Sequence, residues 1–135
     1  MDIIKLDGNG WHSAVYRLLE ELKRYGKIED IDSAYKSIIE RENIASTYIG
    51  NNIMVPHAVI DATDNVSWIM GISRKGVKVL NSIANIIVLV VSGKRNPKKY
   101  IITLSKIARI LLAENILEKD DNYIKKVFET ITGNI

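Results

Sequence analysis

The feature that most constrains the fold is the run Asn85–Val91 (NIIVLVV), in which apolar, mostly β-branched side chains follow one another without alternation. β-branched residues favour strands, and a strand that is apolar at successive positions buries both of its faces. Such a strand needs a layer of structure on each side of its sheet. The run therefore predicts a central strand between two helical layers.

Helical periodicity appears twice before this strand and twice after it. Apolar residues recur there at spacings of three and four, with charged residues on the opposite face. Asn9 is the expected N-cap of the first helix, Gly26 its expected left-handed stop, and Asp30 or Asp32 the expected cap of the second. The predicted helices cover about residues 10–25, 31–43, 97–113 and 121–131.

The middle of the chain has the signals of strands. The predicted strands are 52–55, 66–73, 76–80 and 85–91. Together with the helices they predict an α/β fold with a small mixed sheet of about four to five strands, flanked by helices on both faces. We expect one domain over residues 1–135, and the strand order does not follow from the sequence.

Composition excludes several classes of function. The chain has no cysteine, which removes disulfides, thiolate metal sites and cysteine nucleophiles. Its net charge of +3, from 19 Lys and Arg against 16 Asp and Glu, is too small to indicate nucleic acid binding. The longest apolar run, Ile86–Val91, is far shorter than the ~20 residues that span a bilayer, and the N-terminus lacks a secretory pattern. We therefore expect a cytoplasmic protein that neither binds nucleic acid nor inserts into a membrane.

His57 is the residue with the clearest chemical potential. It follows Pro56, which lacks an N–H and ends the strand 52–55, and the small Ala58 leaves space beside the ring. An imidazole serves as acid or base, metal ligand or covalent nucleophile. His12 is the only other histidine, so we expect no metal and no cofactor. From composition alone, a loop histidine without chemistry remains the alternative.

Residues 39–58 (IERENIASTYIGNNIMVPHA) carry a pattern that favours a functional His57 over a loop histidine without chemistry. The stretch resembles the active-site signature of the mannitol/fructose-class, or type 2, enzyme IIA domains of the bacterial phosphoenolpyruvate-dependent sugar phosphotransferase system. It contains that family's ERE, its ST pair, its glycine and its proline–histidine followed by a small residue. Met54 stands where the family usually has alanine. The resemblance extends along nearly the whole chain.

The resemblance implies a phosphotransferase with a phosphohistidine intermediate. His57 matches the histidine whose Nε2 accepts a phosphoryl group from the histidine phosphocarrier protein and passes it to a IIB domain. Arg41 matches an arginine beside the phosphoryl group, and Ser46 and Thr47 match hydroxyl positions that donate to it. The alternative roles are an ion pair with a neighbouring glutamate for Arg41, and capping or turn formation for the two hydroxyls.

Tyr100 departs from the family pattern, which has a second histidine at the start of the helix that follows. A tyrosine hydroxyl donates a hydrogen bond but carries no positive charge at neutral pH, and the adjacent Lys99 is the candidate for that charge. Tyr100 can also serve simply as an aromatic packed on the sheet edge. The substitution leaves open weakened transfer, a regulatory domain whose phosphorylation controls transcription or nitrogen-related signalling, and an inactive relative. The basic run 94–99 (KRNPKK) is either a solvated loop or attracts a phosphorylated or acidic partner.

Overall fold

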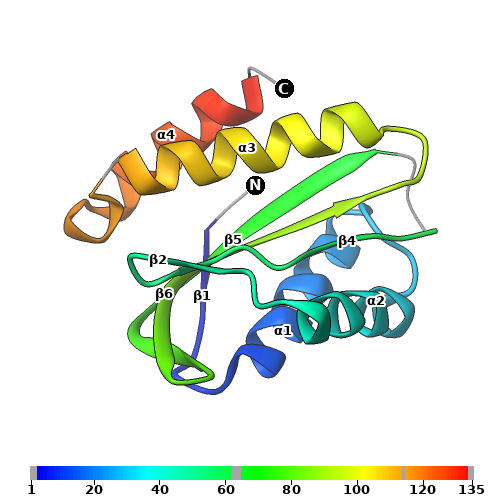
Figure 1. Ribbon diagram of the computed structural model, residues 1–135. Coiled ribbons are helices and arrows are strands. Elements are labelled where there is room, and N and C mark those ends of the chain that lie inside the picture. The colour runs from blue at the N-terminus through cyan, green and yellow to red at the C-terminus, as the bar shows by residue number, and fades with distance from the viewer. Residues whose placement is uncertain (1–2, 62–64, 114, 134–135) are drawn as a thin grey trace.

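The computed structural model describes residues 3–61, 65–113 and 115–133, and it is a three-layer α/β arrangement (Figure 1). A mixed sheet lies between two helical layers, α1 with α2 on one face and α3 with α4 on the other. The described helices are α1 (Trp11–Arg24), α2 (Ile31–Ile44), α3 (Pro97–Ala113), α4 (Asp121–Gly133) and the 3-10 turn η1 (Ile116–Glu118). The described strands are β1 (Ile4–Lys5), β2 (Tyr48–Gly50), β3 (Ile53–Met54), β4 (His57–Val59), β5 (Val66–Val79) and β6 (Ser82–Ser92).

The predicted helices are confirmed to within two residues at each end. Asp30 caps α2, since its carboxylate accepts the N–H of Ser33 at 3.1 Å. Gly26 follows α1 with a φ of +73°, as expected of a left-handed stop. The prediction for Asn9 is wrong, because the N-cap of α1 is Gly10, which has no side chain to satisfy the free amides.

The sheet has the order β1-β5-β6-β3-β2, and β4 also pairs with β6. β3 and β4 run parallel to β6 one after the other, with Ile53 beside Ile86 and His57 beside Val90. They are one strand position interrupted at Pro56, so six labelled strands occupy five positions. The segments 66–73 and 76–80, predicted as separate strands, are the single strand β5 with a bulge between Ile72 and Val77. The short strands β1, β2 and β4 have too few residues for a periodic signal.

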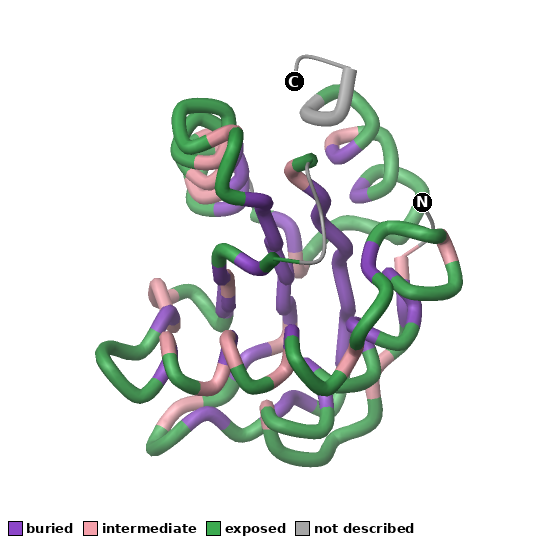
Figure 2. The backbone as a smooth tube through the Cα atoms, turned by 90° about the vertical axis from the view of Figure 1, so that its right-hand side faces the viewer, coloured by how far each residue is buried: buried purple, intermediate pink, exposed green. Residues whose placement is uncertain are grey.

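The central strand β6 has the two-sided burial that its sequence predicts. Ile87, Leu89 and Val91 pack in the core beneath α1 and α2. Ile86 and Val88 lie in a second core that includes residues of α3, η1 and α4. Figure 2 shows the buried segments along the strands and the exposed segments on the outer helices. Among the described residues, no helix combines the length and the apolar character needed to cross a bilayer.

The bulge in β5 depends on Gly76. Its φ is +93°, a conformation that side-chain-bearing residues rarely adopt, and its N–H donates to the hydroxyl of Ser73 at 3.1 Å. A Cβ at this position would collide with Cγ2 of Ile83 on the paired strand. Backbone conformation and space both require glycine here.

We predict that Gly76→Ala lowers the free energy of unfolding by about 2–4 kcal/mol, from backbone strain and the clash with Ile83. Gly10→Ala is the matched control, because Gly10 has a φ of −68° and nothing within 4 Å of an added Cβ. Its expected cost is about 0.5 kcal/mol. Urea denaturation of both variants measures the difference, and equal midpoints would contradict this role of Gly76.

Candidate functional site

His57 is the first residue of β4, immediately after the interruption at Pro56. The sequence predicted it just beyond a strand end, whereas it begins the next strand segment. The chain stays hydrogen-bonded to β6 across this interruption, because the Pro56 carbonyl accepts the N–H of Val90 at 3.0 Å. His57 also pairs with Val90, whose side chain belongs to the core beneath α3, whereas the neighbouring Ala58 belongs to the opposite core. This alternation places the imidazole on the α3 side of the sheet.

A hydrogen bond to the backbone fixes the tautomer of the His57 ring. Nδ1 lies 2.7 Å from the carbonyl oxygen of Val55, two residues earlier. A carbonyl only accepts hydrogen bonds, so Nδ1 carries the proton. In the neutral ring the lone pair is then on Nε2, which is the nitrogen left available for chemistry.

The surroundings of His57 favour the neutral ring. Partial burial lowers the pKa of His57, and the positive charge of Arg41 lowers it further. The hydrogen bond to Val55 and the charge of Glu42 raise the pKa, but the net shift is downward. At neutral pH the imidazole is therefore uncharged and nucleophilic.

Arg41 lies in the last turn of α2, and its positive charge acts on both His57 and Tyr100. Its Nη1 donates to the carbonyl of Ala45 at 3.1 Å. No ion pair between described residues joins it to Glu40 or Glu42, the alternative that its sequence context offered. The bond to Ala45 engages one terminal nitrogen of the guanidinium and leaves further N–H groups for an anion.

Thr47 and Ser46 have different environments. Thr47 is buried, and both its amide, at 3.0 Å, and its hydroxyl donate to the buried carboxylate of Glu42. Ser46 is exposed, and its hydroxyl oxygen accepts the N–H of Tyr48 at 3.2 Å. The Thr47 carbonyl accepts the N–H of Val55 at 3.0 Å. Through Thr47, Glu42 thus ties the end of α2 to Val55, two residues before His57. Sequence analysis did not single out this role of the second glutamate of the ERE motif.

Tyr100, in the first turn of α3, faces the imidazole edge-on. The two ring centroids are 6.0 Å apart with an interplanar angle of 64°. Tyr100 also packs against the core beneath α3, as the alternative role predicted. Burial raises the pKa of Tyr100 to about 12, so its hydroxyl stays protonated and remains a donor. Lys99 is exposed, and among the described residues His57 bonds to Val55 and packs edge-on against Tyr100, not against Lys99.

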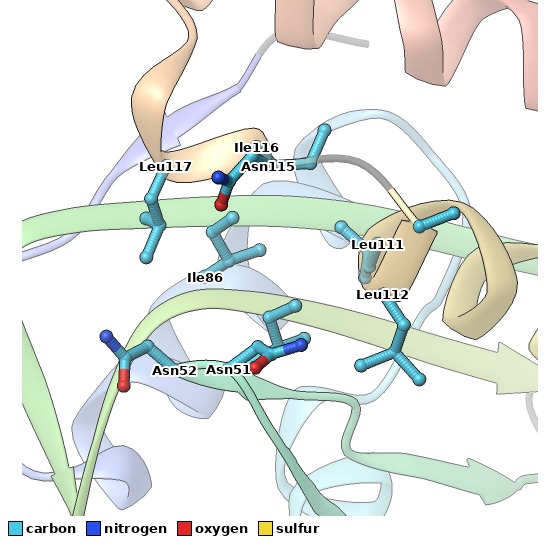
Figure 3. Close-up of a pocket in the computed structure, with 10 residues that line it drawn as sticks. Asn51, Asn52, Ile86, Leu111, Leu112, Asn115, Ile116 and Leu117 are labelled. Atoms are coloured by element: carbon cyan, nitrogen blue, oxygen red, sulfur yellow. The ribbon is translucent and has the colours of Figure 1, made fainter.

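A separate hollow of about 610 Å³ lies at the other end of α3 (Figure 3). It is bounded by the β2–β3 turn, the C-terminus of α3 and η1, and Asn51, Asn115 and Leu112 are among its lining residues. None of the predicted site residues lines it. Within the described ranges, no three histidine or carboxylate side chains gather as metal ligands would.

Comparison with known proteins places this arrangement in a family. The model of the family "Phosphoenolpyruvate-dependent sugar phosphotransferase system, EIIA 2" matches residues 2–131. The chain is 27% identical over 109 residues to the fructose-specific EIIA component of Haloferax volcanii, covering 78% of this chain and 71% of that protein. It is 31% identical over 98 residues to the mannitol-specific EIICBA component of Buchnera aphidicola, covering 70% of this chain but only 15% of that larger protein. The resemblance read from residues 39–58 is thereby confirmed.

Solved structures share the fold at low sequence identity. The nitrogen regulatory protein IIA-Ntr of Neisseria meningitidis superposes with a TM-score of 0.80 at 14% identity, covering 93% of this chain and 90% of that one. The IIA mannitol enzyme of Escherichia coli, solved in complex with phosphorylated IIB, gives 0.66 at 18% identity, covering 93% and 83%. The predicted α/β fold, with helices on both faces of the sheet, is confirmed.

We predict that the His57 ring titrates below its ordinary pKa and that Arg41→Gln raises that pKa, because a nearby positive charge is removed. Titration of the ring by NMR gives both values. Arg24→Gln, on the distant helix α1, is the control and leaves the pKa of His57 unchanged. A wild-type pKa at or above the ordinary value would overturn the assignment of a neutral nucleophile.

Proposed function

The chain belongs to the type 2 enzyme IIA family of the phosphoenolpyruvate-dependent sugar phosphotransferase system, and from that premise we propose that Nε2 of His57 carries a phosphoryl group between two proteins. The observation that supports this most strongly is the 2.7 Å contact from Nδ1 to the Val55 carbonyl, since it leaves the lone pair on Nε2. Residues 1–135 act as one enzyme IIA-like domain in the cytoplasm. The protein is a phosphotransferase that needs no cofactor.

The transfer is an exchange between two imidazoles. The Nε2 lone pair of neutral His57 attacks the phosphorus of the donor's phosphohistidine and forms a new N–P bond. The N–P bond of the donor breaks, and its electron pair returns to the donor ring. No water enters and no external proton is consumed, because each ring keeps a proton on the nitrogen that does not bond phosphorus, so the donor leaves as neutral imidazole. In His57 that proton is on Nδ1, where the Val55 carbonyl stabilises the positive charge of the phosphorylated ring. Catalysis then depends on in-line placement and charge stabilisation.

The predicted site residues stabilise the phosphoryl oxygens in different ways. Arg41 supplies positive charge and N–H donors, and Tyr100 supplies a neutral hydroxyl donor. The exposed Ser46 hydroxyl is a second donor. Thr47 acts through Glu42 to hold the loop, since its own hydroxyl proton is engaged there. Lys99 adds charge when its flexible side chain turns toward the phosphoryl group.

The surface beside His57 suits transient docking of a protein. Val59, the next residue of β4 on the same face, is 44% exposed, Ile101 beside Tyr100 is 63% exposed and Ile44 near Arg41 is 82% exposed. Exposed aliphatic side chains around a reactive group are typical of a protein interface. The donor is the histidine phosphocarrier protein and the acceptor a IIB domain of the fructose or mannitol class. The solved IIA–IIB mannitol complex supports the acceptor.

A second candidate function is regulatory. The fold is close to that of IIA-Ntr, with a TM-score of 0.80. The resemblance of the sequence to the family implies that Tyr100 takes the place of a second histidine. In that case phosphorylation of His57 changes the binding of a partner and does not proceed to a IIB domain. Chasing labelled protein with a IIB domain separates the two functions, because label appears on the acceptor only in the transport branch.

We predict that incubation with phosphoenolpyruvate, enzyme I and the phosphocarrier protein labels the chain with acid-labile, base-stable phosphate. His57→Ala abolishes the label, whereas His12→Ala, at the exposed start of α1, retains it. Label that survives in the His57 variant would exclude Nε2 of His57 as the carrier, and absence of label in the wild type would favour an inactive relative.

We predict further that Tyr100→Phe slows phosphorylation of His57 and that Tyr100→His accelerates it by about ten-fold, because imidazole can donate with positive charge. Stopped-flow transfer from the phosphorylated donor gives the rates. Tyr16→His, on the opposite helical layer, is the control and leaves the rate unchanged. Identical rates in all four proteins would show that residue 100 does not touch the phosphoryl group.

A further inference from the structure

The start of α3 forms a cationic hollow, and of its lining residues only Lys99 has a part in the proposed transfer chemistry. The hollow measures about 500 Å³. Its lining consists of Arg95, Asn96, Pro97, Lys98, Lys99, Ile102 and Lys106. Four of these described residues are cations, and none carries a carboxylate. We call this set the basic rim.

The basic rim adjoins the proposed site through one helical turn. The Asn96 carbonyl accepts the N–H of Tyr100 at 3.0 Å, and the Tyr100 ring contacts His57. Lys98 and Lys99 directly precede Tyr100 in the first turn of α3, so a protein that covers the His57 ring comes near this turn. The rim belongs to the margin of that docking surface, outside the reacting atoms.

The composition of the rim favours a protein over a small anion. Lys98 and Lys99 are exposed, and the neighbouring Ile101 and Ile102 expose 63% and 43% of their surface. Charges interleaved with exposed aliphatic residues match an interface with an apolar centre and a polar edge. The preceding Lys94 differs, because it forms an ion pair with Asp61 at 2.9 Å and lies outside the rim.

We propose that the basic rim selects a phosphoryl donor protein whose docking face is acidic around its phosphohistidine. This inference rests on the phosphoryl-carrier function proposed above. Complementary charge mainly raises the association rate and rejects partners of like charge. Screening over a Debye length of about 8 Å at physiological salt makes the selection strongest at low ionic strength.

The test uses two forms of one phosphocarrier protein that differ only in the residues ringing the histidine, acidic in one and basic in the other. Phosphorylation of His57 by each form is timed by stopped flow at low and high salt. The wild-type chain reacts faster with the acidic form, and this preference shrinks as salt rises. Lys98→Glu reduces the preference by about five-fold. Lys98 is outside the proposed transfer machinery, so its change spares the chemical step.

Lys78→Glu is the matched control. Lys78 is exposed on β5 and pairs with Ile83, seven positions along β6 from Val90, the partner of His57. Lys78→Glu changes the net charge by the same amount as Lys98→Glu and preserves the preference for the acidic donor. A wild-type chain that reacts equally with both donors, or a Lys98 variant that behaves like the Lys78 variant, overturns the inference even though His57 is phosphorylated. If neither donor phosphorylates His57, the phosphoryl-carrier function itself fails.

Discussion

The hydrogen bond between Nδ1 of His57 and the Val55 carbonyl is the interaction on which the proposed chemistry depends. At 2.7 Å it orients the ring, fixes the proton on Nδ1 and leaves Nε2 as the nucleophile. The bond forms across Pro56, which interrupts the strand while its own carbonyl stays bonded to Val90 of β6. The Val55 carbonyl, just before this interruption, faces the His57 ring just after it. The rest of the fold, from the buried β6 to the Glu42–Thr47 bond, holds that break in place.

Burial and charge act together on this ring. The partly apolar environment lowers the pKa of His57, which keeps the ring uncharged, as the proposed attack on a phosphoryl donor requires. The same burial raises the pKa of Tyr100, which keeps its hydroxyl a donor. Arg41 supplies the positive charge that both rings lack. A neutral nucleophile beside a fixed cation is a suitable arrangement for receiving an anionic group that must later leave again.

Periodicity in the sequence predicted the long elements because each has enough residues to express a pattern. The unbroken apolar run Asn85–Val91 predicted a strand buried on both faces, and the helical periodicity predicted four helices whose ends lie close to the observed ones. β1, β2 and β4 were missed because two or three residues carry no period, and the order of the strands depends on contacts between distant segments. His57, Arg41, Ser46 and Thr47 were proposed as site residues because residues 39–58 resemble a family signature, and the family match supports that proposal. The engagement of Thr47 by Glu42 was not predicted, since it depends on the side-chain packing that buries both residues.

The most direct measurement is the ¹⁵N NMR spectrum of the chain labelled in its imidazole nitrogens, recorded before and after phosphorylation. A His57 ring held by Val55 shows a protonated Nδ1 beforehand, and coupling of ³¹P to Nε2 afterwards with Nδ1 still protonated. A proton on Nε2 in the free protein, or phosphorus bonded to Nδ1, would contradict the role assigned to the Val55 carbonyl.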